Sequence, residues 1–292
     1  MIREAAVAGS FYPESPADCA QAADDCFELA GKPLTIDARI VGGVVPHAGW
    51  SCSGMVSATV FGNIAAQRKP ETIVFFGAVH RPTRTPAALF PGGCWRSPLG
   101  SMAIDGRLAE RVLSHTNLIA DDPYAHDDEH SIEVQVPLLQ RLWPQAKLLP
   151  IMVLPSSQAV EIGGIVGQTL ASYHYDAVVL ASSDLTHYGR RYGFTPKGHG
   201  ATGLEWAKNV NDRAIIDRML QMDANEIVAE ALEHRNACGG GAIAAAMSAA
   251  RMLGADRAQL LRHVTSRETL RSVDDDHAVG YAGIVFTASP SS

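Results

Sequence analysis

Two histidines follow apolar runs of the sequence, at positions where a side chain can take part in chemistry. His47 stands in Pro46-His47-Ala48-Gly49, directly after residues 40–45, and His80 comes shortly after residues 72–76. A neutral imidazole binds metal ions, and it also transfers protons near neutral pH. A single loop histidine is more often structural. Two at equivalent strand ends favour a shared site, because in open α/β sheets ligands bind beyond the carboxyl ends of the strands.

A cysteine precedes an alanine-rich helical pattern. Cys238-Gly239-Gly240-Gly241 comes just before residues 242–253. We expect the positive end of this helix to lower the pKa of the Cys238 thiol, because it stabilises the thiolate. Thiolate is the form that binds a metal or attacks an electrophile. The glycines permit close approach of the backbone to a ligand, and no Gly-Lys-Ser/Thr follows that would complete a Walker loop.

Two polar clusters add acid–base groups. The first runs from Ser182 to His187 after an apolar strand, and a helical turn there would place Asp184 and His187 on one face. The second is Glu129-His130-Ser131-Ile132-Glu133, where His130 could serve as an acid, a base or a partner of a metal ligand. Capping of a helix by Ser or Asp, and acids at a helix start, are structural explanations. The residues alone leave both readings open.

The elements that must position these groups alternate between strands and helices. Short apolar runs predict strands at residues 40–45, 72–76, 147–153, 176–181, 261–265 and 279–286. Helical patterns occupy residues 53–66, 107–114, 131–143, 159–172, 205–222, 224–233 and 241–253. We expect Ser53 to cap the first helix, and Pro137 to impose a kink or an earlier boundary on the third. The alternation predicts one α/β domain with a central, mostly parallel or mixed sheet that helices cover on both faces.

Composition and charge limit the classes of protein. The chain has 292 residues, of which 47% are apolar and 19% charged, so a large core can form. The net charge of -7 argues against nucleic-acid binding. No long apolar run predicts a membrane span or a signal peptide, so the expected location is the cytoplasm. The five cysteines contain no CxxC, which excludes a zinc ribbon and argues against a disulfide framework.

Several motifs, taken in order, resemble those of the Memo family. They are Ala8-Gly9-Ser10-Phe11-Tyr12-Pro13, Pro46-His47-Ala48-Gly49, Glu129-His130-Ser131-Ile132-Glu133, Ser182-Ser183-Asp184 with His187, and Cys238-Gly239. The resemblance covers residues 1–287, which form a single Memo-like domain, and leaves residues 288–292 as a polar tail. It implies a fold like that of the class III extradiol dioxygenases.

The resemblance also implies roles for the residues. His47, His80 and Cys238 would be metal ligands, and Asp184, His187 and His130 would line the same pocket. Iron or copper is the expected metal, with zinc less favoured. Bacterial members are often encoded beside a radical SAM protein and an AMMECR-type protein, so these are the implied partners.

The chain departs from the family in detail. Phe11 stands where the family often has tryptophan, and Trp50-Ser51-Cys52 replaces a more tyrosine-rich stretch. Gly240-Gly241-Ala242 follows the cysteine where animal proteins carry Arg-His-Pro. These departures argue against peptide binding of the animal type and leave the implied ligands intact.

The implied donor set favours one function and leaves two others open. Two imidazoles and a thiolate suit copper, zinc or iron, and three protein ligands leave a coordination position open. The leading hypothesis is a metal-dependent, dioxygenase-like redox enzyme whose substrate is a small molecule, with aromatic molecules among the candidates. His187 would be its acid or base, oriented by Asp184 or His130. The alternatives are a non-catalytic module that binds a peptide or protein, and a zinc hydrolase with Glu129 or Asp184 as base. The sequence is compatible with a homodimer.

Overall fold

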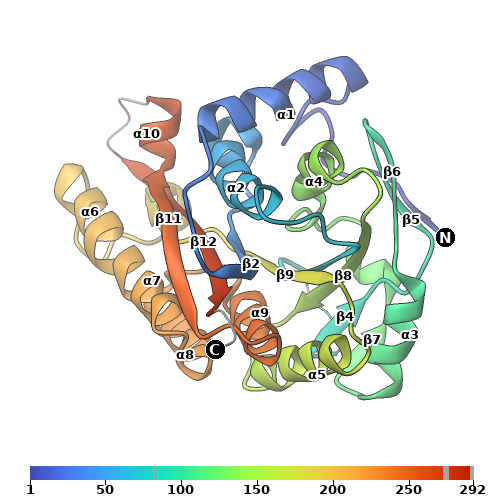
Figure 1. The fold of residues 1–292 in the computed structure, drawn as a ribbon. Helices are drawn as coiled ribbons and strands as arrows, with labels where there is room; N and C mark the ends of the chain where they lie inside the picture. The colour runs from blue at the N-terminus through green and yellow to red at the C-terminus, as the bar shows by residue number, and fades with distance from the viewer. Residues whose placement is uncertain (82, 84, 272–275, 290–292) are drawn as a thin grey trace.

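The centre of the molecule is a mixed β-sheet (Figure 1). The computed structural model describes residues 1–81, 83, 85–271 and 276–289. The strands of this sheet are β2 (Arg39–Val45), β3 (Thr72–Gly77), β4 (Ala87–Leu89), β7 (Ile119–Asp121), β8 (Lys147–Val153), β9 (Ala177–Ser182), β10 (His187–Gly189), β11 (Arg257–Thr265) and β12 (His277–Ala288). Their order is β10-β12-β2-β9-β3-β8-β4-β7, and β11 pairs with β12.

The direction of the strands confirms the predicted mixed sheet. The inner strands β2, β9, β3 and β8 are parallel to one another. β12 runs antiparallel to β2, and β4 runs antiparallel to β8. The parallel strands are buried over nearly their whole length, which explains why the sequence shows them as continuous apolar runs.

Helices cover both faces of the sheet, as predicted (Figure 1). The helices are α1 (Pro16–Ala30), α2 (Trp50–Ala65), α3 (Gly106–Ser114), α4 (Val136–Leu142), α5 (Ala159–Ser172), α6 (Ala201–Trp206), α7 (Asp212–Leu220), α8 (Ala224–His234), α9 (Gly240–Met252) and α10 (Ser266–Leu270). One apolar cluster joins α1, α2 and α4 to the sheet, and a second joins α5, α7, α8 and α9 to it.

A small sheet lies apart from the central one. It consists of β1 (Ile2–Arg3), β5 (Cys94–Ser97) and β6 (Gly100–Ala103), in the order β1-β5-β6. The sequence patterns did not predict these strands, nor β4 and β7, because each spans only two to four residues. Such short elements contain too few residues to establish a period of two.

Several predicted boundaries need correction. The first predicted helix begins at Trp50 with Gly49 as its N-cap, so the N-cap prediction for Ser53 is wrong; the Ser53 hydroxyl donates to the carbonyl of Ala48 (2.9 Å). The expected boundary near Pro137 is present. A separate 3-10 turn ends at Gln135, and Pro137 lies in the first turn of α4, which begins at Val136. The predicted helix at residues 205–222 is interrupted by a π turn at Ala207–Asn211. Ala288, assigned to the tail, ends β12, and residues 290–292 of the tail lie outside the described part of the chain.

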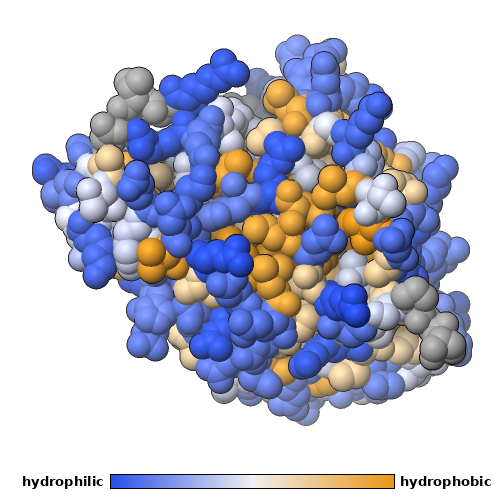
Figure 2. All heavy atoms as spheres, turned by 60° about the vertical axis from the view of Figure 1, so that its left-hand side comes forward, coloured by the Kyte–Doolittle hydropathy of each residue, from blue (hydrophilic) through white to orange (hydrophobic). Residues whose placement is uncertain are grey.

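The face of the molecule in Figure 2 is largely polar. Figure 2 shows a face on which hydrophilic residues predominate, with apolar residues gathered near its middle. Within the described residues, no helix combines the length and the apolar character that crossing a bilayer requires.

Candidate metal centre

Three histidines from separate segments meet beyond the carboxyl ends of the parallel strands. His47 follows β2, His80 follows β3, and His130 precedes the 3-10 turn before α4. A nitrogen of each ring lies within 4.8 Å of a nitrogen of the others. His47 is buried, His130 is half-buried and His80 is exposed, so the group is open to solvent on the side of His80. The predicted meeting of His47 and His80 at one edge of the sheet is therefore confirmed.

The hydrogen bonds around His47 determine which of its nitrogens faces the cluster. The hydroxyl of Ser182 donates its only hydrogen to the carbonyl of Ser131 (2.6 Å), so its oxygen must accept from Nδ1 of His47. The proton therefore resides on Nδ1, and Nε2 carries a free lone pair. Burial, together with the neighbouring histidines, places the pKa of His47 well below its ordinary value. His47 is thus a neutral imidazole whose Nε2 can donate its lone pair to a metal ion.

Glu129 holds His80 in the corresponding way. Its carboxylate accepts from the His80 amide (2.8 Å) and from Nδ1 of the same residue (3.0 Å). Nε2 is therefore the nitrogen of His80 that remains available to a metal ion. Burial alone would lower the pKa of His80, but the hydrogen bond and charge of Glu129 outweigh it and raise that pKa. Burial would raise the pKa of Glu129, but its hydrogen bonds to His80 outweigh burial and hold it at about 2. Glu129 is ionised at neutral pH.

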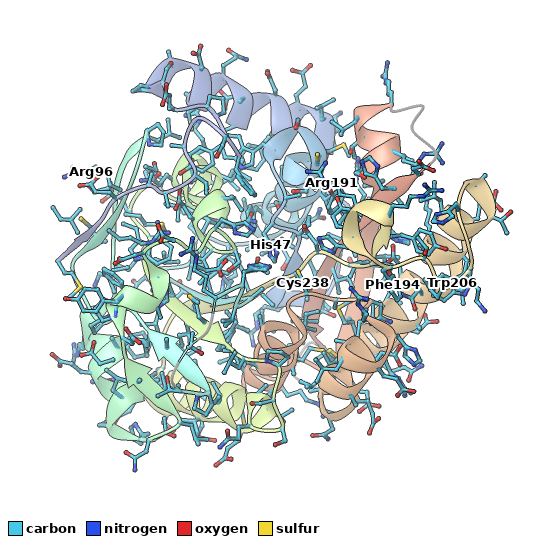
Figure 3. The ribbon with its side chains drawn as sticks, turned by 180° about the vertical axis from the view of Figure 1, so that it is seen from behind. His47, Arg96, Arg191, Phe194, Trp206 and Cys238 are labelled. Carbon is cyan, nitrogen blue, oxygen red and sulfur yellow. The ribbon has the colours of Figure 1, made fainter. Side chains whose placement is uncertain are left out.

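Cys238, which the family resemblance implied as a ligand, lies beside His47 but outside the group of three histidines (Figure 3). Its Sγ is 3.2 Å from Nε2 of His47, and its amide donates to the carbonyl of Asp184 (3.1 Å). The predicted lowering of the thiol pKa is wrong for the metal-free protein. Burial and the nearby carboxylate of Asp184 raise the pKa of Cys238, and they outweigh the dipole of α9. The thiol is protonated at neutral pH unless a cation displaces its proton.

Asp184 and His187 come from the segment after β9, which is not helical. The predicted helical turn is therefore wrong, and His187 instead begins β10. Asp184 is buried and accepts from the amide of His47 (2.8 Å), so it fixes the backbone that carries a candidate ligand. Burial raises the pKa of Asp184, against the opposing effect of His187. Nδ1 of His187 donates to the carbonyl of Leu185 (3.0 Å), which leaves Nε2 as its basic nitrogen.

The donor set fits a metal ion. Nε2 of His47 is unprotonated and accepts from the thiol of Cys238, and Nε2 of His80 is the nitrogen of that ring that Glu129 does not bind. The other ring nitrogen of each histidine is held by Ser182 or Glu129, as it is in protein metal sites where outer groups orient the ligands. His130 offers a third imidazole, stacked on His80 with ring centroids 4.7 Å apart.

Three features of the site were not predicted from the sequence. Ser182 orients His47, Glu129 orients His80, and the ring of Phe11 packs on His130 with centroids 4.8 Å apart. Ser182 and Glu129 stand in the two polar clusters that the sequence singled out, but their partners are distant in the chain. The position of Ser182 at the end of an apolar run was the one signal available in the sequence.

A family model and curated relatives match nearly the whole chain. The family described as Memo-like protein matches residues 3–285. A MEMO1 family protein of Thermococcus kodakarensis is 36% identical over 98% of this chain and 99% of its own length. A MEMO1 family protein of Methanothermobacter thermautotrophicus is 34% identical over 97% of this chain and 99% of its own length. The solved structure of an uncharacterized protein, JW3007 from Escherichia coli K12, aligns with 83% of this chain and 99% of its own, at 11% identity and a TM-score of 0.46.

Proposed function

This chain belongs to the family of Memo-like proteins, and we propose that it is a metal-dependent redox enzyme that acts on a small molecule, with His47, His80 and Cys238 as its metal ligands. The observation that carries the proposal is the approach of the Cys238 thiol to the unprotonated Nε2 of a neutral His47, at 3.2 Å. Two imidazoles and a thiolate form a soft donor set, which suits iron or copper better than magnesium or calcium.

The proposed roles follow from which atoms are free. Nε2 of His47, Nε2 of His80 and Sγ of Cys238 would hold the ion, and His130 would face it from the side of Phe11. Bound iron or copper would supply one-electron chemistry that no side chain supplies. The open side at His80 would admit the small molecule, an aromatic one included.

The acid–base role falls to His187. Its Nδ1–H is held by the carbonyl of Leu185, so Nε2 can take a proton from a bound molecule and return it later. The ring of Tyr192 stands at 82° to it, with centroids 5.1 Å apart, and restricts its rotation. Asp184 would act through His47, whose amide it holds, and so is a positioning residue in this proposal.

The test is the metal content of protein purified without oxygen or chelators, compared with that of Cys238→Ala. We expect near-stoichiometric iron or copper in the wild type and its loss in the variant. Cys94→Ala is the matched control, because Cys94 is also a partly exposed thiol but lies on β5 in the small sheet. Zinc without a redox response would favour a hydrolase. Absence of metal from both proteins would contradict the proposal and favour a binding module.

A further inference from the structure

We propose that this protein has a second ligand site, at the end of the sheet opposite the metal centre, which binds a small molecule bearing a phosphate or carboxylate group. An open cavity of about 1000 Å³ lies where β3, β8 and β9 begin. The histidines of the metal centre follow the carboxyl ends of the parallel strands, whereas this cavity adjoins their amino ends. It has the size of a small-molecule site and leaves room for more than a bare ion.

Basic side chains line this cavity. They are Lys69, Arg107, Arg111 and Lys147. Within the part of the chain that the structure describes, none of the four forms an ion pair. Of the lining acids, Asp105 accepts from Thr72 Oγ1 (2.7 Å) and from the amide of Leu108 (3.0 Å), and Asp176 is paired with Arg68. Glu71 is the remaining acid of the lining, so the cavity has an excess of unpaired positive charge.

Two buried hydrogen-bond donors in the lining have no partner. The indole N–H of Trp143 and the hydroxyl of Tyr175 form no hydrogen bond within the described residues. Trp143 is only 4% exposed, so water in bulk cannot satisfy its N–H. Burial of an unpaired polar group is unfavourable, and most such groups in proteins have a partner. The oxygens of a phosphate or carboxylate accept without donating, so they suit a lining that contains unpaired donors.

The guanidinium of Arg111 is held in position on the wall of the cavity. It lies over the ring of Tyr173, with its central carbon 3.7 Å from the ring centroid. A stacked guanidinium keeps its N–H groups in a fixed plane, and that fork matches the geometry of a phosphate or carboxylate. Arg107, one helical turn earlier on α3, is exposed and free to close over the same ligand. Charge, unpaired donors and a fixed arginine thus converge on one ligand chemistry.

The experiment is calorimetric titration of the metal-stripped protein with phenyl phosphate. We expect saturable binding with a Kd of about 1 mM or tighter. Tyr175→Phe, Trp143→Phe and Arg107→Gln should each weaken it about five- to tenfold, since each removes one donor to an oxyanion. Tyr175→Phe should also leave the melting temperature of the ligand-free protein unchanged or raise it, because the hydroxyl it removes is unpaired. A merely structural hydroxyl would lower the melting temperature and leave binding unchanged.

Two controls separate this site from other places where the probe could bind. Tyr124→Phe removes a hydroxyl from an exposed tyrosine outside the cavity and should leave the affinity unchanged. His80→Ala should also leave it unchanged, because His80 belongs to the metal centre. The proposal is overturned if phenyl phosphate fails to saturate the wild type at about 10 mM. It is also overturned if the three cavity variants bind like the wild type, or if His80→Ala abolishes binding.

Discussion

The Sγ atom of Cys238 lies 3.2 Å from Nε2 of His47, although the two residues are 191 positions apart in the chain. Close packing of Gly239 against the end of β9 makes this contact possible. A Cβ at Gly239 would lie 2.2 Å from the carbonyl oxygen of Ser182, so only glycine fits without a shift. The Gly239 amide donates to the hydroxyl of Ser183 (2.9 Å), which fixes the loop that carries the thiol. The glycine after the cysteine therefore positions a candidate ligand.

Replacing the thiol with a carboxylate should change the metal preference of the site. Thiolate is a soft ligand that favours copper(I), whereas carboxylate favours harder ions. We expect Cys238→Asp to lower the affinity for copper(I) much more than the affinity for iron(II). The measurement is competition with chelators of known affinity, under exclusion of oxygen. Cys94→Ser should change neither affinity, and an unchanged affinity for copper(I) in Cys238→Asp would contradict a ligand role for the thiol.

Glu129 should control metal affinity without touching the metal. Glu129→Gln retains the shape of the side chain but removes the charge that holds His80 by two hydrogen bonds. Loss of such an outer partner typically costs 10–100-fold in metal affinity, and we expect about that loss here. The same chelator competition measures it. Glu133→Gln is the matched control, because Glu133 is equally buried yet, among the described residues, its side chain bonds to the N-terminal segment and Tyr12 instead of to His80.

Glu133 should control stability instead. Its carboxylate pairs with the buried guanidinium of Arg3 (2.7 Å) and accepts from the amides of Ala6 and Val7. Glu133→Gln leaves the positive charge of Arg3 buried and uncompensated, which we expect to lower the free energy of unfolding by about 3 kcal/mol. Urea unfolding checks it. The exposed pair of Arg96 and Glu4 is the comparison, and Glu4→Gln should cost less than about 1 kcal/mol.

Elements with long, uniform patterns were the predictable part of this fold. The strand at residues 147–153 and the helix at residues 159–172 have the predicted bounds. In each, most of the buried residues are the apolar ones on which the prediction was based. Helix α1 was not predicted, although Ser15 caps it and Pro16 begins it. Its buried stripe consists of Cys19, Ala23 and Cys26, which are too small to produce a clear hydrophobic period.

The candidate site was predictable as a set of positions, but its chemistry depends on burial. Strand ends placed His47 and His80 together, and the Memo resemblance implied Cys238 as a further ligand, which the structure shows beside His47. The pKa of the thiol was predicted in the wrong direction because a dipole is a local feature, whereas burial and the charge of Asp184 arise from distant segments. The partnership of Ser182 with His47 depends likewise on the pairing of β2 with β9.

The contact between α5 and α9 should tolerate no side chain at Gly163. A Cβ at Gly163 would lie 2.0 Å from the carbonyl oxygen of Ala245, whereas the nearest atom to a Cβ at Gly164 is Ser248 Oγ at 3.4 Å. We expect Gly163→Ala to lower the free energy of unfolding by about 1–3 kcal/mol, because the helices must separate. Gly164→Ala should be neutral or stabilising by up to about 1 kcal/mol, since alanine favours the helix. Similar effects of the two substitutions would contradict so close an approach of these two helices.

His126 should make the folded state sensitive to acid. It is fully buried, its Nε2–H donates to the carbonyl of Ala88 (3.2 Å), and Nδ1 has no partner within the described residues. Burial, with the charge of Arg3, lowers the pKa of His126 from 6.5 to about 3. In the unfolded chain His126 binds a proton at the higher value, so its contribution to stability is fully present above that value. It is lost as the pH falls from 6.5 towards about 3.

The expected slope is about 1.4 kcal/mol of unfolding free energy per pH unit in that window, because one proton is taken up on unfolding. Glutamine at this position cannot bind a proton, so His126→Gln should reduce the slope of unfolding free energy against pH by that amount, whatever its effect on stability at neutral pH. Urea unfolding of metal-stripped protein from pH 4 to pH 7 measures the slope. His199→Gln, at an exposed histidine, should keep the slope of the wild type. A neutral buried imidazole that causes the acid sensitivity must bind a proton as the chain unfolds. If His126→Gln keeps the slope of the wild type, proton uptake by His126 is not the cause of that slope.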